Sequence, residues 1–316
     1  MFYPPPMFII NSIAPIFLLI ALGKLLHKTG FFPEPFFKGL NKLVYWFALP
    51  ALLTSRISIA RFEFGTISRV FLLFTIATLL SLGIAWGAAR LLKLPAPKTG
   101  SFIQGSFRGN GAFIGLPVVV YALGDLDPQA EVLGLLLLAA LTILFNILSV
   151  VVLVHHGRRR AGTKESIRIS MEQLVKNPLI LACVAGMALN LAGIALPPFL
   201  FRPLDALGNA ALPLVLFGIG ASLTFERLHG AASPTLVASL IKVAATPALG
   251  FLVAAFFDLG TVERMVAILY LASPAAAASY VMAEMMDNDG PLAGRIVALS
   301  TLLSAITLPI IIALGL

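Results

Sequence analysis

The chain has 316 residues, of which 59% are hydrophobic and only 11% are charged. Because soluble domains carry about 25% charged residues, this composition excludes an ordinary soluble protein and predicts a polytopic membrane protein. The net charge of +8 does not indicate a nucleic-acid partner, since Lys and Arg lie between apolar segments, where they would meet anionic lipid headgroups. The single cysteine, Cys183, lies in an apolar run, so neither a disulfide framework nor a zinc-binding spacing is expected.

A helix that spans a bilayer needs about 20 apolar residues. We predict an all-α polytopic membrane protein in which such segments form ten transmembrane helices. In chain order these segments are residues 7–27, 36–56, 66–92, 99–123, 130–154, 177–196, 203–225, 231–257, 262–286 and 291–315.

Basic residues gather in alternate connections between the predicted spans. The first, third and fifth connections are rich in Lys and Arg, and the fifth is a basic linker at residues 155–176. The connection after the fourth span is acidic instead, with Asp125, Asp127 and Glu131. Because basic loops stay in the cytoplasm, this alternation predicts a multi-pass protein of the plasma (cytoplasmic) membrane with both termini outside. The second connection runs against the pattern, with Arg56, Arg61 and Arg69.

Five spans on either side of the basic linker predict two repeats that enter the membrane from opposite sides. The first five-helix repeat is expected at residues 1–154 and the second, inverted, at 177–316, joined by a cytoplasmic linker at 155–176. Three short echoes occur in the same order in both halves. Residues 48–50 resemble 211–213, Pro117 corresponds to Pro274, and residues 141–144 resemble 299–302.

The fourth and ninth predicted spans are each interrupted by a proline among small residues. The fourth contains RGNGAFIGLP at residues 108–117, and the ninth contains LASPAAAAS at 271–279. Proline removes a backbone donor and frees a carbonyl in the preceding turn, whereas glycine lets a ligand or another backbone come close. A plain kink packed by small residues would explain either break alone. Two breaks at matching places in the halves favour broken crossover helices around a binding site at the membrane midplane.

The predicted substrate site takes its residues from these two breaks and from the fifth span. Asn110 offers donors and an acceptor that can bind a ligand or cap exposed backbone. The full set comprises Arg108, Asn110, Gly111, Gly115, Pro117, Thr142, Asn146, Ser273 and Pro274.

Three ionisable residues within the predicted spans are candidates for function. An arginine at the depth of Arg108 is costly unless it meets an anion, a carbonyl or water, which favours a small organic carboxylate as substrate, although snorkelling to the interface is the alternative. Glu284 and Lys242 are candidates for proton or cation coupling, or else interface anchors. No cofactor and no metal site are expected.

An intramembrane enzyme is not expected. Nucleophilic chemistry needs a histidine base within hydrogen-bond reach, and the histidines lie at span ends or in loops: His27, His155, His156 and His229. A pore is a further alternative, which saturable flux and countertransport would exclude.

Several stretches together resemble the auxin efflux carrier family. Residues 41–50 (NKLVYWFALP) are similar to its second-helix signature, and residues 110–117 to its first crossover. Residues 177–181 are similar to the start of its sixth helix, and residues 213–223 are similar to its seventh helix. Lys242 with Pro247, Pro274 with Glu284, and residues 300–302 complete the match over nearly the whole chain.

This resemblance implies an elevator-type secondary carrier of organic anions, including dicarboxylates or auxin-like acids, with a fold similar to bile-acid/sodium symporters. Helices one, two, six and seven would form a scaffold and a homodimer surface, and helices three to five and eight to ten a moving transport unit. The chain departs from plant members, since it lacks their long hydrophilic loop and has no acidic residue between Phe71 and Ala89. A uniporter or channel-like facilitator and a sodium-coupled symporter are therefore kept as alternatives.

Overall fold

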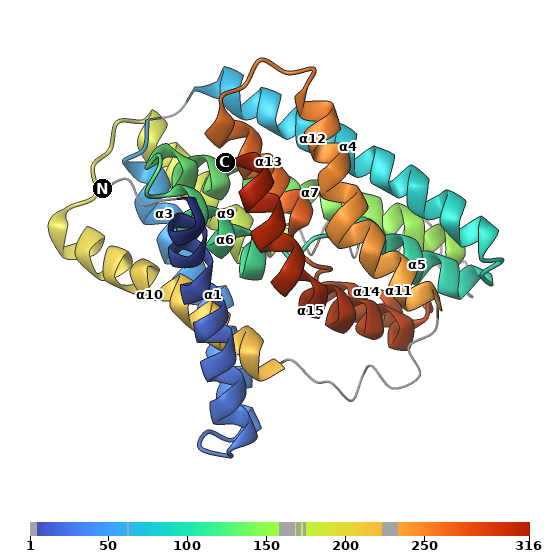
Figure 1. Cartoon of the computed structure of the whole chain (residues 1–316). Coiled ribbons are helices and arrows are strands. Elements are labelled where there is room, and N and C mark those ends of the chain that lie inside the picture. Colours follow the sequence, from blue (N-terminus) through green and yellow to red (C-terminus); the bar gives the residue numbers. More distant parts are fainter. Residues whose placement is uncertain (1–4, 62, 158–167, 169–171, 173–174, 223–232) are drawn as a thin grey trace. The chain divides into compact units, whose positions relative to one another are not determined.

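The computed structural model describes residues 5–61, 63–157, 168, 172, 175–222 and 233–316. Regular structure in this part of the chain is helical, apart from an isolated antiparallel bridge between Gly109 and Ala275 (Figure 1). Five of the described helical stretches are long and apolar enough to cross a membrane, which confirms the expected class of all-helical membrane protein. They are α4 (Phe64–Leu91), α7 (Gln129–His156), α10 (Pro198–Ser222), the continuous stretch Ser233–Ala254 and α15 (Gly290–Gly315). Most of the predicted basic linker, residues 155–176, lies outside the described residues.

The chain folds into two compact units that alternate along the sequence. Unit 1 consists of Met1–Ile67, Ala112–Ala140 and Leu174–Leu223. Unit 2 consists of Ser68–Gly111, Leu141–Gln173 and Thr224–Leu316. Each unit therefore contains residues from both halves of the sequence.

Unit 1 is held together by close helix packing. Besides the first part of α7, its helices are α1 (Pro5–Lys28), α2 (Glu34–Leu43), η1 (Val44–Ala48), α3 (Leu49–Ser58), α6 (Leu116–Leu123), α9 (Pro178–Leu191) and α10. Glycine lets α1 and α10 touch, because a Cβ at Gly220 would lie 1.9 Å from the carbonyl oxygen of Ile20. Asn177 caps the start of α9 by accepting from the amide of Leu179 at 2.9 Å.

Unit 2 is built around α15, which packs against α5, α11, α13 and α14. Its helices, besides most of α4 and the second part of α7, are α5 (Ala96–Phe107), α11 (Ser233–Leu240), η4 (Ile241–Ala245), α12 (Thr246–Ala254), α13 (Thr261–Ala272), α14 (Ala278–Met285) and α15. Gly105 permits the approach of α5, because a Cβ there would lie 2.9 Å from a methyl group of Ile296. Phe74, Phe102 and Phe107 are fully enclosed in the core of this unit.

Three π-helical segments stand in a fixed relation to prolines. The segments η1, η2 (Gly111–Gly115) and η4 each end two residues before a proline, at Pro50, Pro117 and Pro247. The wider turn is visible in the backbone, since the amide of Thr246 donates to the carbonyl of Ile241, five residues back. A wider turn relieves the clash between a proline ring and the carbonyl of the preceding turn. The helix therefore continues through these prolines.

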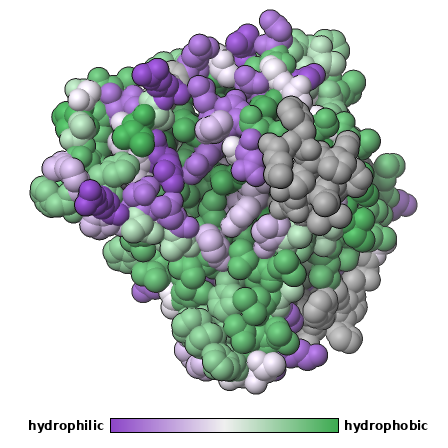
Figure 2. All heavy atoms as spheres, turned by 60° about the vertical axis from the view of Figure 1, so that its left-hand side comes forward, coloured by the Kyte–Doolittle hydropathy of each residue, from purple (hydrophilic) through white to green (hydrophobic). Residues whose placement is uncertain are grey.

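Apolar side chains cover much of the molecular surface. On α4, Leu72, Leu79 and Ile84 are exposed, as are Val151 on α7 and Leu314 on α15. Figure 2 shows broad hydrophobic areas on one face of the molecule. Such a surface would be unfavourable in water and suits contact with lipid.

Candidate functional site

The chain leaves helical geometry at two places in unit 2 and pairs there with itself. Helix α5 ends at Phe107 and α13 ends at Ala272, and each is followed by extended backbone. The amide of Asn110 donates to the carbonyl of Pro274 at 2.7 Å. The amide of Ala276 donates to the carbonyl of Arg108 at 3.0 Å, on either side of the bridge between Gly109 and Ala275. We call residues 108–110 and 273–276 the paired breaks.

The first break differs in position from the sequence-based expectation. Interruption at Pro117 was expected, but η2 runs directly into α6 through this proline, and the extended residues are 108–110. The wider π-helical turn accommodates the proline, so the helix is not broken there. Gly109 allows the close approach instead, because a Cβ at this residue would lie 2.5 Å from Ser273 Oγ and 3.3 Å from the carbonyl oxygen of Tyr270.

Local side chains satisfy the backbone groups that the second break leaves open. Pro274 has no amide hydrogen, and the carbonyl of Tyr270 accepts from Ser273 Oγ at 2.7 Å instead. The amide of Ala275 donates to Ser300 Oγ on α15 at 3.0 Å. In a bilayer these bonds replace the water that would otherwise solvate a broken helix.

Arg108 lies inside unit 2, and only 8% of its surface is exposed. Its Nη2 donates to Asn146 Oδ1 at 2.9 Å and its Nη1 to Ser149 Oγ at 3.2 Å, both on α7. The same guanidinium contacts Met282 Sδ on α14. These contacts hold a cation beside the paired breaks.

Asn110 presents its side chain next to the same backbone pairing. Its backbone amide is used by Pro274, whereas its side-chain amide has no hydrogen-bond partner among the described residues. The residue is partly exposed. Thr142 is partly buried on α7, one turn before Asn146.

The structure thus brings together part of the predicted set within unit 2. Arg108, Asn110, Asn146, Ser273 and Pro274 are joined directly or through the paired backbone. Gly111 ends the unit 2 segment, whereas Gly115 and Pro117 are buried in unit 1.

The two coupling candidates differ sharply in environment. Lys242 in η4 is 0% exposed, and its Nζ donates to the carbonyl of Leu271 at 2.5 Å. Glu284, in contrast, is exposed in the last turn of α14.

Sequence reasoning missed several side chains that complete this site. Ser149 and Ser300 bind Arg108 and Ala275, and Gln104 donates to Met282 Sδ at 3.9 Å while its buried Oε1 has no partner among the described residues. A helical spacing was available as a signal, because Gln104 precedes Arg108 by four residues and Ser149 follows Asn146 by three. Met282 offers no such signal, since a methionine in an apolar helix is ordinary.

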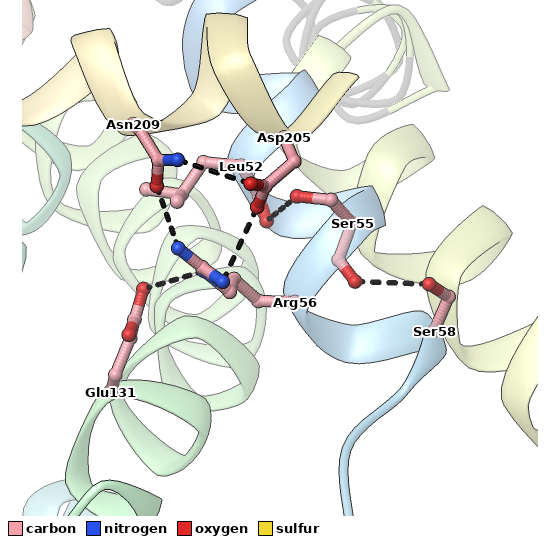
Figure 3. Close-up of polar contacts among 7 residues, drawn as sticks. All are labelled: Leu52, Ser55, Arg56, Ser58, Glu131, Asp205 and Asn209. Carbon is pink, nitrogen blue, oxygen red and sulfur yellow. Dashed lines mark hydrogen bonds and ion pairs between the residues drawn. The ribbon is translucent and has the colours of Figure 1, made fainter. Parts of the chain in front are cut away.

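A second polar cluster lies in unit 1 (Figure 3). Arg56 on α3 forms ion pairs with Glu131 on α7 at 3.4 Å and Asp205 on α10 at 3.3 Å, and its Nη2 donates to Asn209 Oδ1 at 2.6 Å. Asn209 in turn donates to Asp205 at 3.1 Å. Arg56, which departs from the loop-charge pattern, is thus bound to two carboxylates and an amide within unit 1.

Comparison with known proteins places this chain among membrane transporters. The family model described as membrane transport protein matches residues 8–312. An uncharacterized transporter of Methanothermobacter thermautotrophicus is 27% identical over 95% of this chain and 96% of its own length. An uncharacterized transporter of Methanocaldococcus jannaschii is 23% identical over 93% of this chain and 94% of its own. The chain therefore belongs to the membrane transport protein family, that of the auxin efflux carriers, and is a multi-pass membrane protein of this family.

Proposed function

We propose that this protein is a secondary carrier of small organic anions, and that a carboxylate group of the substrate binds at the paired breaks of unit 2. The observation that carries the proposal is the buried guanidinium of Arg108, held beside the paired breaks by Asn146 and Ser149. A buried cation in a membrane protein marks a binding or transport pathway. Arginine in particular offers a planar fork that matches a carboxylate.

The start of α14 supports the choice of an anion. This helix begins at Ala278, directly after the second break, and its N-terminus carries a partial positive charge. Met282, one turn into α14, contacts Arg108. The side-chain amide of Asn110, on a partly exposed residue, adds a neutral donor near the same backbone. These features all favour a negatively charged group over a cation.

The wider architecture that we propose is ten membrane helices in two inverted repeats, with crossovers at the paired breaks. The division of the chain into two interleaved units supports an elevator mechanism, since unit 2 contains both breaks and most of the third, eighth, ninth and tenth predicted helices. Unit 1, with the first, second, sixth and seventh, would serve as scaffold and as the surface of a homodimer. We propose the cytoplasmic membrane as its location, with both termini outside.

Transport by purified protein in proteoliposomes tests the substrate class. Radiolabelled mono- and dicarboxylates, succinate among them, are measured for saturable uptake and for countertransport, beside cationic and neutral solutes. Arg108→Gln is expected to lower carboxylate transport at least tenfold, since a lost hydrogen bond to a charged group costs about 1.5–3 kcal/mol. Arg108→Lys should recover it only in part, because an ammonium lacks the fork of the guanidinium.

Arg90→Gln is the matched control. Arg90 is exposed in the same unit and stacks on Trp86 at 3.6 Å from the ring centroid, so the same change of charge should leave transport intact. The proposal is wrong if Arg108→Gln leaves carboxylate transport unchanged, or if only cationic solutes are transported.

A further inference from the structure

We propose that the ammonium group of Lys242 is a permanent cation at the paired breaks and that it takes the place of a coupling ion. The carrier then moves its substrate without sodium. The statement about transport rests on the proposed function, whereas the role of the ammonium can be tested apart from it.

The second break deprives the carbonyl of Leu271 of its helical donor. In an uninterrupted helix the carbonyl of Leu271 would accept from the amide of Ala275. That amide donates to Ser300 Oγ instead, at 3.0 Å. Lys242 Nζ fills the place of the missing donor at 2.5 Å from the Leu271 carbonyl oxygen.

The side chain of Lys242 reaches this carbonyl from another helix. It projects from the π-helical segment η4, and its Cε lies 3.4 Å from the position that a Cβ of Gly109 would occupy. The ammonium group is therefore placed by the first break as well as by the second. A longer side chain at residue 109 would displace it.

The hydrogen-bonding capacity of the ammonium is not exhausted. A lysine ammonium has three donors, and among the described residues the carbonyl of Leu271 is its hydrogen-bond partner. The group is 0% exposed. A fully enclosed cation with donors to spare is costly, so negative charge nearby has to stabilise it.

The C-terminal ends of two helices provide this negative charge. The C-terminal ends of α5 and α13 meet at the paired breaks, and each carries a partial negative charge of about half an elementary charge. In membrane carriers with broken helices, unwound carbonyls and helix C-termini are the groups that coordinate a sodium ion. Lys242 supplies the positive charge at such a place from the chain itself.

Removal of the ammonium should therefore create a cation site. We compare Lys242→Ala with the unmodified protein by thermal unfolding in choline, sodium and n-propylammonium chloride at equal ionic strength. Choline is too large for the space, whereas n-propylammonium has the carbons and the ammonium group that the substitution removes. A cation that binds the folded state raises the unfolding temperature by mass action.

The unmodified protein should unfold at the same temperature in all three salts. Lys242→Ala should unfold at a lower temperature in choline and recover by several degrees, saturably, in n-propylammonium or sodium. Lys98→Ala removes an exposed charge from the same unit and should behave as the unmodified protein. Where Lys242→Ala yields no folded protein, Lys242→Gln, which keeps most of the side-chain length but carries no charge, is compared in choline and sodium instead.

An unfolding temperature of the variants that is equal in all three salts overturns the proposal. So does carboxylate transport by the unmodified protein that requires sodium. Transport by Lys242→Ala should be lost in choline and rise several-fold with n-propylammonium. If the unmodified protein transports no carboxylate at all, the proposed function fails, and the unfolding measurement still decides the role of Lys242.

Discussion

The amide of Asn110 donates to the carbonyl of Pro274 at 2.7 Å, across 164 residues of sequence. The backbone of Asn110 alone makes this link between the paired breaks, and its side chain forms no hydrogen bond among the described residues. Substitution of the side chain should therefore affect ligand binding and spare the fold.

Asn110→Ala should lower carboxylate transport at least tenfold, because loss of a hydrogen bond to the substrate costs about 1–3 kcal/mol. Its unfolding temperature should stay close to that of the unmodified protein. Uptake in proteoliposomes and thermal unfolding of the same preparation provide the two measurements. Transport at the unmodified level would show that the residue is peripheral to the substrate.

Gly109→Ala should disturb the paired breaks themselves. The added Cβ would lie 2.5 Å from Ser273 Oγ, and overpacking of this kind costs about 1–3 kcal/mol. Thermal unfolding should show the loss. The double variant Gly109→Ala/Ser273→Ala removes the closest contact and should recover part of the stability, while the carbonyl of Tyr270 and Lys242 Cε still limit the space.

If the double variant is no more stable than Gly109→Ala alone, the approach to Ser273 is not what requires glycine. Ser273→Ala by itself serves as the reference, because it removes the hydroxyl that donates to Tyr270.

The Arg56 cluster should contribute modestly to stability, and its contribution should depend on salt. The side chains of Arg56, Glu131 and Asp205 are 31%, 24% and 30% exposed, so water screens the ion pairs in part. A double-mutant cycle with Arg56→Ala and Glu131→Ala should give a coupling free energy of about 0.5–1 kcal/mol. The coupling should fall as ionic strength rises. A coupling of zero at low salt would contradict the contact.

The proposed orientation can be tested by cysteine labelling. Cys183 is buried and is first replaced by serine. A cysteine at Asp125 should then react with an impermeant maleimide from outside intact cells, and one at Lys98 should react only after permeabilisation. The reverse pattern would invert the topology and leave the repeat arrangement untouched.

Much of the helical framework could be predicted from apolar run length. Each of the ten predicted spans contains described helix, and the expected span at 66–92 corresponds to α4 at Phe64–Leu91. Run length could not show where a helix leaves its regular path. Pro117 was the obvious candidate, but the structure absorbs it with a wider turn and breaks at Arg108 to Asn110, where a close backbone approach requires glycine.

The environments and partners of charged side chains could not be predicted from the sequence either. Lys242 and Glu284 looked alike as ionisable residues in spans, yet one is enclosed against a helix end and the other is exposed. Arg56 runs against the loop-charge pattern, and its carboxylate partners lie 75 and 149 residues further along the chain. Such distinctions depend on tertiary contacts, which local patterns do not encode.

Each π-helical segment ends two residues before a proline, and its extra residue changes how the rest of the helix is rotated about its axis. One extra residue in a turn rotates everything beyond it by about 100° around the helix axis. If Pro247 were replaced by a residue with an amide hydrogen, η4 could tighten to an ordinary α-helical turn. Thr246, whose hydroxyl lies 2.6 Å from Ser81 Oγ on α4, would then swing to a different side of the helix. Each proline thereby sets the rotational register of the helix that follows it.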